Sequence, residues 1–118
     1  MKIAVFAAVL SILATVSQAG TPVVMGVEAS HSGNSWRFDV SLRHADEGWN
    51  HYADGWGVYL EDGTELGYRV LMHPHVNEQP FTRSLGNVKI PPGTGWVKIV
   101  PHDLVHGNGE AFLVELKR

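Results

Sequence analysis

Histidine is the residue type with the clearest chemical potential in this sequence, because seven imidazoles occur in 118 residues. In His73-Pro74-His75 two imidazoles are two positions apart, so an extended backbone directs both to one side, and the proline restricts the backbone between them. In the segment from His102 to His106 the pair is four positions apart, and it converges only if the chain turns. Both spacings indicate a metal site.

Carboxylates accompany the histidines in the same stretches of sequence. His44 precedes Asp46, and His51 precedes Asp54. Such acids either bind a metal directly or accept the second N–H of an imidazole that does. The leading predicted ligands are His44, His73, His75, His102 and His106, and the next two are His51 and Glu78. Four to six donors fill the coordination shell of one ion, so some of these residues must have other roles.

The donor types restrict the choice of metal. Neutral imidazole together with carboxylate suits Zn(II), Cu(II), Ni(II) or Fe(II). The chain contains no cysteine, which excludes thiolate metal sites, iron–sulfur clusters and disulfides. We predict a transition-metal cofactor, Cu(II) or Zn(II), with copper first because nitrogen-rich sites favour it.

Net charge argues against a nucleic-acid-binding protein, and length argues against a protein of several domains. Nine Lys and Arg against twelve Asp and Glu give a net charge of −3, which disfavours binding to nucleic acid. A chain of 118 residues has room for one domain.

The first residues have the pattern of a secretory signal peptide. Lys2 is followed by an apolar run from Ile3 to Val16, and Ser17-Gln18-Ala19 offers the small residues that signal peptidase recognises. The apolar run, about 14 residues long, is too short to span a bilayer. We predict cleavage after Ala19, which gives a signal peptide over 1–19 and a single domain over 20–118. The mature protein is then periplasmic or secreted, with no membrane attachment after cleavage.

Alternation of apolar and polar residues predicts an all-β domain. Trp36, Phe38, Val40 and Leu42 alternate with polar residues, as in a strand that is buried on one face. Seven strands are predicted, at about 22–30, 35–43, 55–61, 64–73, 82–90, 95–102 and 110–117. This number suits an antiparallel β-sandwich of the immunoglobulin or fibronectin-III type, with a small closed barrel as the alternative. Trp56, Met25 and Met72 are predicted to lie in the core.

Strand order brings distant histidines to one end of such a sandwich. Where successive strands reverse direction, alternate connections share an end. The connections over 44–54, 74–81 and 103–109 therefore lie together, and six histidines lie in or beside them. His31 is expected at the opposite end.

One segment also carries a resemblance. The run from His73 to Ser84, HPHVNEQPFTRS, with His44-Ala45-Asp46 and the segment from His51 to Asp54 before it, resembles a family of small, uncharacterised exported bacterial proteins. The resemblance covers most of the mature chain. It implies a compact periplasmic domain, and it implies no activity and no ligand set.

These features predict a periplasmic metal-binding protein, a chaperone or buffer for copper or zinc with a delivery partner in the same compartment. One alternative is a metal-dependent, hydrolase-like enzyme with Glu78 or Asp46 as general base, although the chain has no H-E-x-x-H motif, nucleophile elbow or phosphate loop. Another is a protein- or glycan-binding module whose histidines are structural or sense pH.

Overall fold

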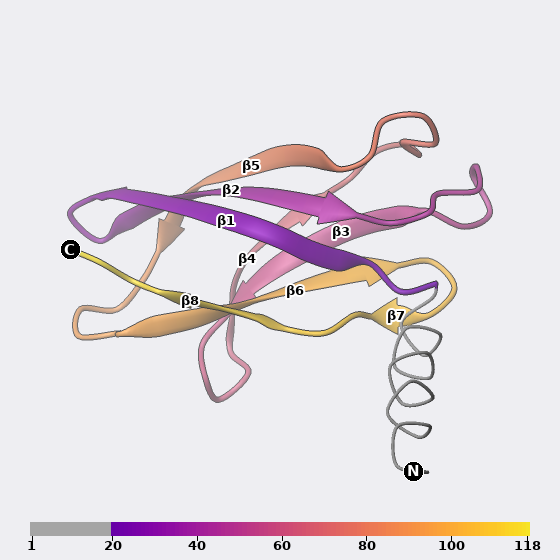
Figure 1. The fold of residues 1–118 in the computed structure, drawn as a ribbon. Coiled ribbons are helices and arrows are strands. Elements are labelled where there is room, and N and C mark those ends of the chain that lie inside the picture. The colour runs from indigo at the N-terminus through magenta and orange to yellow at the C-terminus, as the bar shows by residue number, and fades with distance from the viewer. Residues whose placement is uncertain (1–19) are drawn as a thin grey trace, which may run out of the picture.

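Eight strands form two antiparallel sheets in residues 20–118, the part of the chain that the computed structural model describes (Figure 1). The predicted signal peptide, 1–19, lies outside the described residues. The strands are β1 (Val23–Ser32), β2 (Ser35–Arg43), β3 (Ala53–Tyr59), β4 (Glu65–Val70), β5 (Phe81–Lys89), β6 (Trp96–Asp103), β7 (Gly107–Asn108) and β8 (Phe112–Glu115). Among the described residues, no helix is long and apolar enough to cross a membrane.

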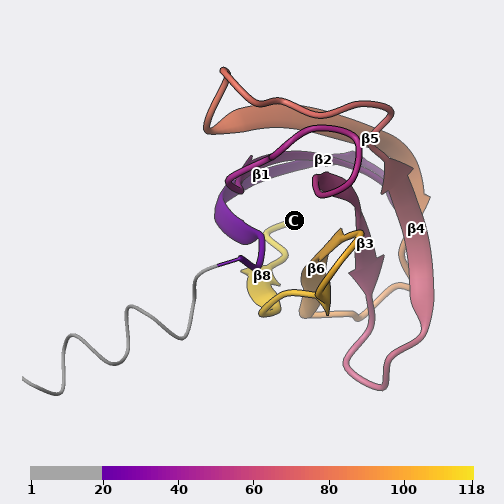
Figure 2. The same ribbon diagram turned by 90° about the vertical axis from the view of Figure 1, so that its right-hand side faces the viewer.

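The two sheets pack as the layers of a β-sandwich, which confirms the predicted fold class (Figure 2). One sheet has the order β1-β2-β5. The other has β3 between β4 and β6, and both β7 and β8 pair with the far edge of β6. The structure has eight strands where seven were predicted. The additional strand is β7, a two-residue pairing with β6 inside the predicted connection over 103–109.

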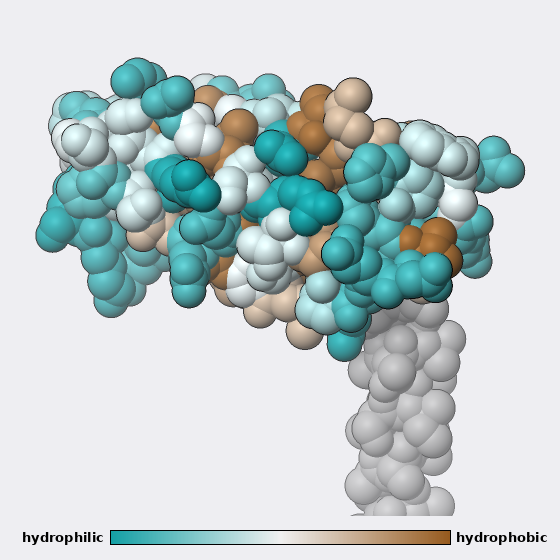
Figure 3. Space-filling model, turned by 90° about the horizontal axis from the view of Figure 1, so that it is seen from above, coloured by the Kyte–Doolittle hydropathy of each residue, from teal (hydrophilic) through white to brown (hydrophobic). Residues whose placement is uncertain are grey.

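The alternation along β2 has the expected consequence for burial. Trp36, Phe38, Val40 and Leu42 are each no more than 1% exposed, and Trp56 of β3 lies opposite them with no exposed surface. The outer face of the three-stranded sheet is mostly hydrophilic, with scattered apolar residues (Figure 3). Polar side chains bond to one another across that sheet, for example Ser41 and Thr82 at 2.7 Å. A one-sided apolar pattern thus defines the core.

The two methionines predicted in the core are exposed instead, and the pattern of pairing explains why. Met25 is 46% exposed because β1 has a register shift against β2 between Val24 and Gly26, which displaces the alternation by one residue. Met72 is 73% exposed because β4 ends at Val70, and Leu71, at 2% exposed, enters the core in its place. Both positions were wrong because a strict period of two was continued through an irregularity.

Three connections lie together at one end of the sandwich, on the right in Figure 1. They are 44–52 between β2 and β3, 71–80 between β4 and β5, and 104–106 between β6 and β7. His31, near the end of β1, lies at the other end, where its ring stacks on Trp36 with centroids 4.4 Å apart.

Candidate metal centre

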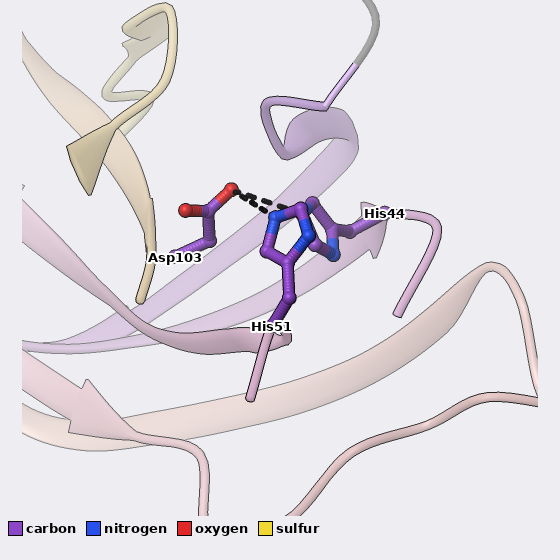
Figure 4. A group of neighbouring side chains, drawn as sticks. All are labelled: His44, His51 and Asp103. Atoms are coloured by element: carbon purple, nitrogen blue, oxygen red, sulfur yellow. Dashed lines mark hydrogen bonds and ion pairs between the residues drawn. The ribbon is translucent and has the colours of Figure 1, made fainter. Parts of the chain in front are cut away.

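One carboxylate oxygen at this end of the sandwich has three imidazoles around it. Oδ2 of Asp103 lies 2.9 Å from Nε2 of His44, 3.3 Å from Nε2 of His51 and 3.1 Å from Nδ1 of His106. Figure 4 shows the first two imidazoles directed at this carboxylate. The four residues are separated by up to 62 positions, from 44 to 106: the three histidines come from two of the three connections, and Asp103 ends β6.

Asp103 is the last residue of β6 and is completely buried. Its other oxygen, Oδ1, accepts hydrogen bonds from the backbone N–H groups of Val105, at 2.8 Å, and His106, at 2.5 Å. A carboxylate that bonds to backbone two and three positions ahead is a typical turn former. This turn brings the side chain of His106 back to Asp103.

His44 follows β2 directly and has a fully buried side chain with a carboxylate at each nitrogen. Nδ1 lies 2.5 Å from Oδ1 of Asp46, and Nε2 lies 2.9 Å from Oδ2 of Asp103. Asp46 also accepts hydrogen bonds from the backbone N–H groups of Ala53 and His75. His44 belongs to the end of the three-stranded sheet and Asp103 to the five-stranded sheet, so this contact joins the two layers.

His51 is held in the same manner from the solvent side. Its Nδ1 lies 2.8 Å from Oε1 of Glu47, and its Nε2 is directed toward Asp103. Its ring centroid lies 4.8 Å from that of His44 and 5.0 Å from that of His106. The hydrogen bond to Glu47 is the largest cause of a raised pKa for His51, with the nearby Asp103 carboxylate adding to it.

The proton count of these two rings is compatible with a cation at the centre. A neutral imidazole has one N–H and one lone pair. In both His44 and His51 each nitrogen faces a carboxylate oxygen, so one N–H can satisfy only one of the two contacts. Each ring must therefore either carry a second proton or direct a lone pair at a cation. In metal sites the outer nitrogen commonly donates to a carboxylate, as Asp46 and Glu47 allow here.

The distances around Asp103 also suit a metal. Ligands at about 2.1 Å from an ion are separated from one another by roughly 3.0–3.4 Å in octahedral or tetrahedral arrangements. The three nitrogen-to-oxygen separations fall at 2.9, 3.1 and 3.3 Å. The ligand atoms of His44, His51 and Asp103 all lie within 4.8 Å of one another. These three residues offer two nitrogens and one oxygen to an ion, and His106 lies beside them through its contact with Asp103.

Electrostatics keeps the central carboxylate charged. Burial alone raises the pKa of Asp103, but hydrogen bonds from the backbone and ring of His106, from Val105 and from His51 outweigh it and lower the pKa to about 2. The centre is reached from one side, because the side chains of His51 and His106 are 14% and 38% exposed while that of His44 is buried.

His73 and His75 form a separate pair in the third connection. Their ring centroids are 4.7 Å apart, and His75 stacks on Phe81 at 3.9 Å. Arg83 donates to Nε2 of His75 at 3.0 Å, while Nδ1 is buried without a hydrogen-bond partner among the described residues. Burial, followed by the charges of Arg83 and His73, lowers the pKa of His75.

The remaining predicted ligands lie in other contacts. Nδ1 of His102 is 2.6 Å from Oδ1 of Asp54, in a half-exposed pair. Glu78 is largely exposed, with its carboxylate 4.0 Å from the guanidinium of Arg83. Neither residue joins the group around Asp103. Asp46, considered above as a general base, has both oxygens occupied by protein hydrogen bonds.

Two residues of the site were not among the predicted ligands. Asp103 lies within the segment from His102 to His106 but was not a predicted ligand, although its position three residues before His106 is the spacing at which an aspartate closes a turn onto a following residue. Gly20 was missed altogether. Its carbonyl oxygen lies 3.2 Å from Nε2 of His44, and no local pattern marks this contact.

We expect His75 to make a contribution to stability that is lost as the pH falls below about 6.5. A histidine whose folded pKa is lowered contributes stability above its unfolded pKa and loses that stability on acidification. Replacing His75 by glutamine should flatten this part of the profile, as measured by urea unfolding of the metal-free protein between pH 8 and pH 5. An unchanged slope in His75→Gln would contradict the assignment.

The chain is similar to one protein in sequence and to one solved structure in fold. No protein-family model matches the chain. A protein of Halomicrobium mukohataei named "Putative lipoprotein" is 41% identical over 87 residues, which is 73% of this chain and 42% of that protein, so the chain spans less than half the length of this relative. The crystal structure of a hypothetical protein from Pyrococcus horikoshii OT3 is similar with a TM-score of 0.51 over 85% of this chain and 90% of that one. At 16% identity, this likeness concerns the fold alone.

Proposed function

We propose that the domain is an exported metal-binding protein whose centre consists of His44, His51, His106 and Asp103. One observation carries the proposal. Three imidazole nitrogens lie within 3.3 Å of a single buried carboxylate oxygen, and two of the imidazoles have another carboxylate at their outer nitrogen. His73, His75, His102 and Glu78 remain untested predictions that this centre does not use.

Copper(II) and zinc(II) are the metals that we propose first. Three nitrogens and one oxygen suit both ions, and the order of intrinsic affinities favours copper. Iron(II) is also compatible with two histidines and a carboxylate. Exposure of His51 and His106 at the rim supports exchange with a delivery partner, which is the behaviour of a chaperone or buffer.

Two observations support the proposal that the protein is exported. The sequence over 1–19 has the pattern of a cleavable signal peptide. The name of the Halomicrobium mukohataei relative, a lipoprotein, also indicates an exported protein. The periplasm is therefore the compartment in which we propose that the centre acquires its metal.

We expect uptake of Cu(II) or Zn(II) at pH 7 that is lost at pH 5. Protons compete with the metal for imidazoles, whose ordinary pKa is about 6.5, whereas Asp103 stays ionised throughout this range. Calorimetry with Cu(II), Zn(II), Ni(II) and, without oxygen, Fe(II) measures both affinity and choice of metal.

A pair of histidine variants localises the site. His51→Ala should weaken binding by at least about tenfold, while His31→Ala, at the opposite end, should leave the affinity unchanged. If no metal binds at either pH, or if the two variants lose affinity equally, the proposed centre is refuted.

A further inference from the structure

Gly20 directly follows the expected cleavage point and packs against the proposed metal centre. Its carbonyl oxygen lies 3.2 Å from Nε2 of His44. A Cβ atom built on Gly20 would lie 2.8 Å from Cε1 and 3.0 Å from Nε2 of His106. Gly20 therefore contacts two of the three imidazoles that surround Asp103.

The ring of His106 occupies the space that a side chain on Gly20 would need. Its φ of +95° is in the region that glycine adopts without strain, and the close approach to His106 leaves no room for Cβ. Covalent dimensions keep the nitrogen of a residue within about 3.6 Å of its own carbonyl oxygen. The Gly20 nitrogen therefore lies no more than about 7 Å from Nε2 of His44, within reach of the group of ligands by rotation of its own backbone.

We propose that cleavage after Ala19 completes the metal centre, with the α-amino nitrogen of Gly20 as a further ligand beside His44, His51, His106 and Asp103. This inference rests on the proposed function. In the precursor the nitrogen belongs to a peptide bond, and its lone pair is delocalised into the carbonyl group. Hydrolysis of the Ala19–Gly20 bond consumes one water and leaves a carboxylate on Ala19 and an amine on Gly20.

The added amine has consequences for affinity and for location. It raises the donor set from three nitrogens and one oxygen to four nitrogens and one oxygen, which remains within the usual four to six ligands. The exported protein then binds metal more tightly than its precursor. Tight capture is therefore coupled to export, and the uncleaved chain competes less well for metal.

Three forms of the domain test this inference, with Cu(II) as the probe. One begins at Gly20, one carries an additional alanine before Gly20, and one begins at Gly20 with an acetylated amine. We expect the first form to bind Cu(II) at least about tenfold more tightly than the other two, as for loss of a ligand or its supporting contact. An alanine added after Arg118, which is exposed, is the matched control and should have no effect.

Spectroscopy provides a second measurement that does not depend on folding of the blocked forms. With isotope-labelled glycine nitrogen, pulsed electron paramagnetic resonance of the Cu(II) complex should detect a directly bound glycine nitrogen in the form that begins at Gly20, and none in the acetylated form. Absence of this coupling overturns the inference, as do equal affinities of all three forms or an exported protein whose mass shows another first residue. Failure of every form to bind Cu(II), Zn(II), Ni(II) or Fe(II) would instead refute the proposed function itself.

Discussion

Asp103→Asn is expected to weaken metal binding by at least about 100-fold, because it removes the only charged oxygen ligand of the proposed centre and leaves three imidazoles facing an amide. Metal-free stability should also fall by about 3–5 kcal/mol, which is typical when one partner of a buried ionic contact is removed. Calorimetry gives the first quantity and urea unfolding the second.

The free energy of unfolding at acidic pH provides a further measurement for the same variant. The pKa of Asp103 is lowered from 3.8 to about 2, so its contribution is complete above about pH 4 and is lost as the pH falls toward 2. Asp103→Asn should lack this loss. Asp62→Asn makes the same charge change in the exposed connection between β3 and β4 and should leave metal affinity intact. Equal losses in the two variants would show that net charge, rather than the centre, controls binding.

Trp56→Ala is expected to destabilise the domain by about 3–5 kcal/mol, because it opens a large cavity in the middle of β3. The indole is fully buried, and its N–H has no hydrogen-bond partner among the described residues. Trp56→Phe should therefore lose clearly less, since it keeps an aromatic ring and removes an unsatisfied donor. Urea denaturation with a constant m-value measures both changes. A Phe variant as unstable as the Ala variant would indicate that the indole N–H has a partner in solution.

The fold was accessible from the sequence because each strand buries one face. The period of two in residues such as Phe38 and Val40 is visible without any tertiary information, and it placed β2 with its observed bounds. The two methionines show the limit of this reasoning. A register shift in β1 and the early end of β4 depend on pairing with neighbouring strands, which one strand's own sequence does not reveal.

The site was accessible only in part, for a related reason. Strand direction predicted that six histidines share one end, and the structure groups three of them around Asp103. The direction of each ring was not predictable. His75 has the chelating spacing, but Phe81 and Arg83 of the adjacent strand engage its ring. Contacts of this kind, like that of Gly20 with His44, join residues far apart in the chain.

The contact between His44 and Asp103 unites the ends of the two layers, and this position gives a bound ion a mechanical role. An ion held by both residues would cross-link the two sheets at one end of the sandwich, so that the sheets could separate there only after the ion is released. Ligand that binds only the folded chain stabilises it in proportion to the logarithm of its free concentration once that exceeds Kd. The metal-bound protein would then resist heat and proteolysis better than the metal-free protein. Proteases of the cell would therefore degrade the metal-free protein first.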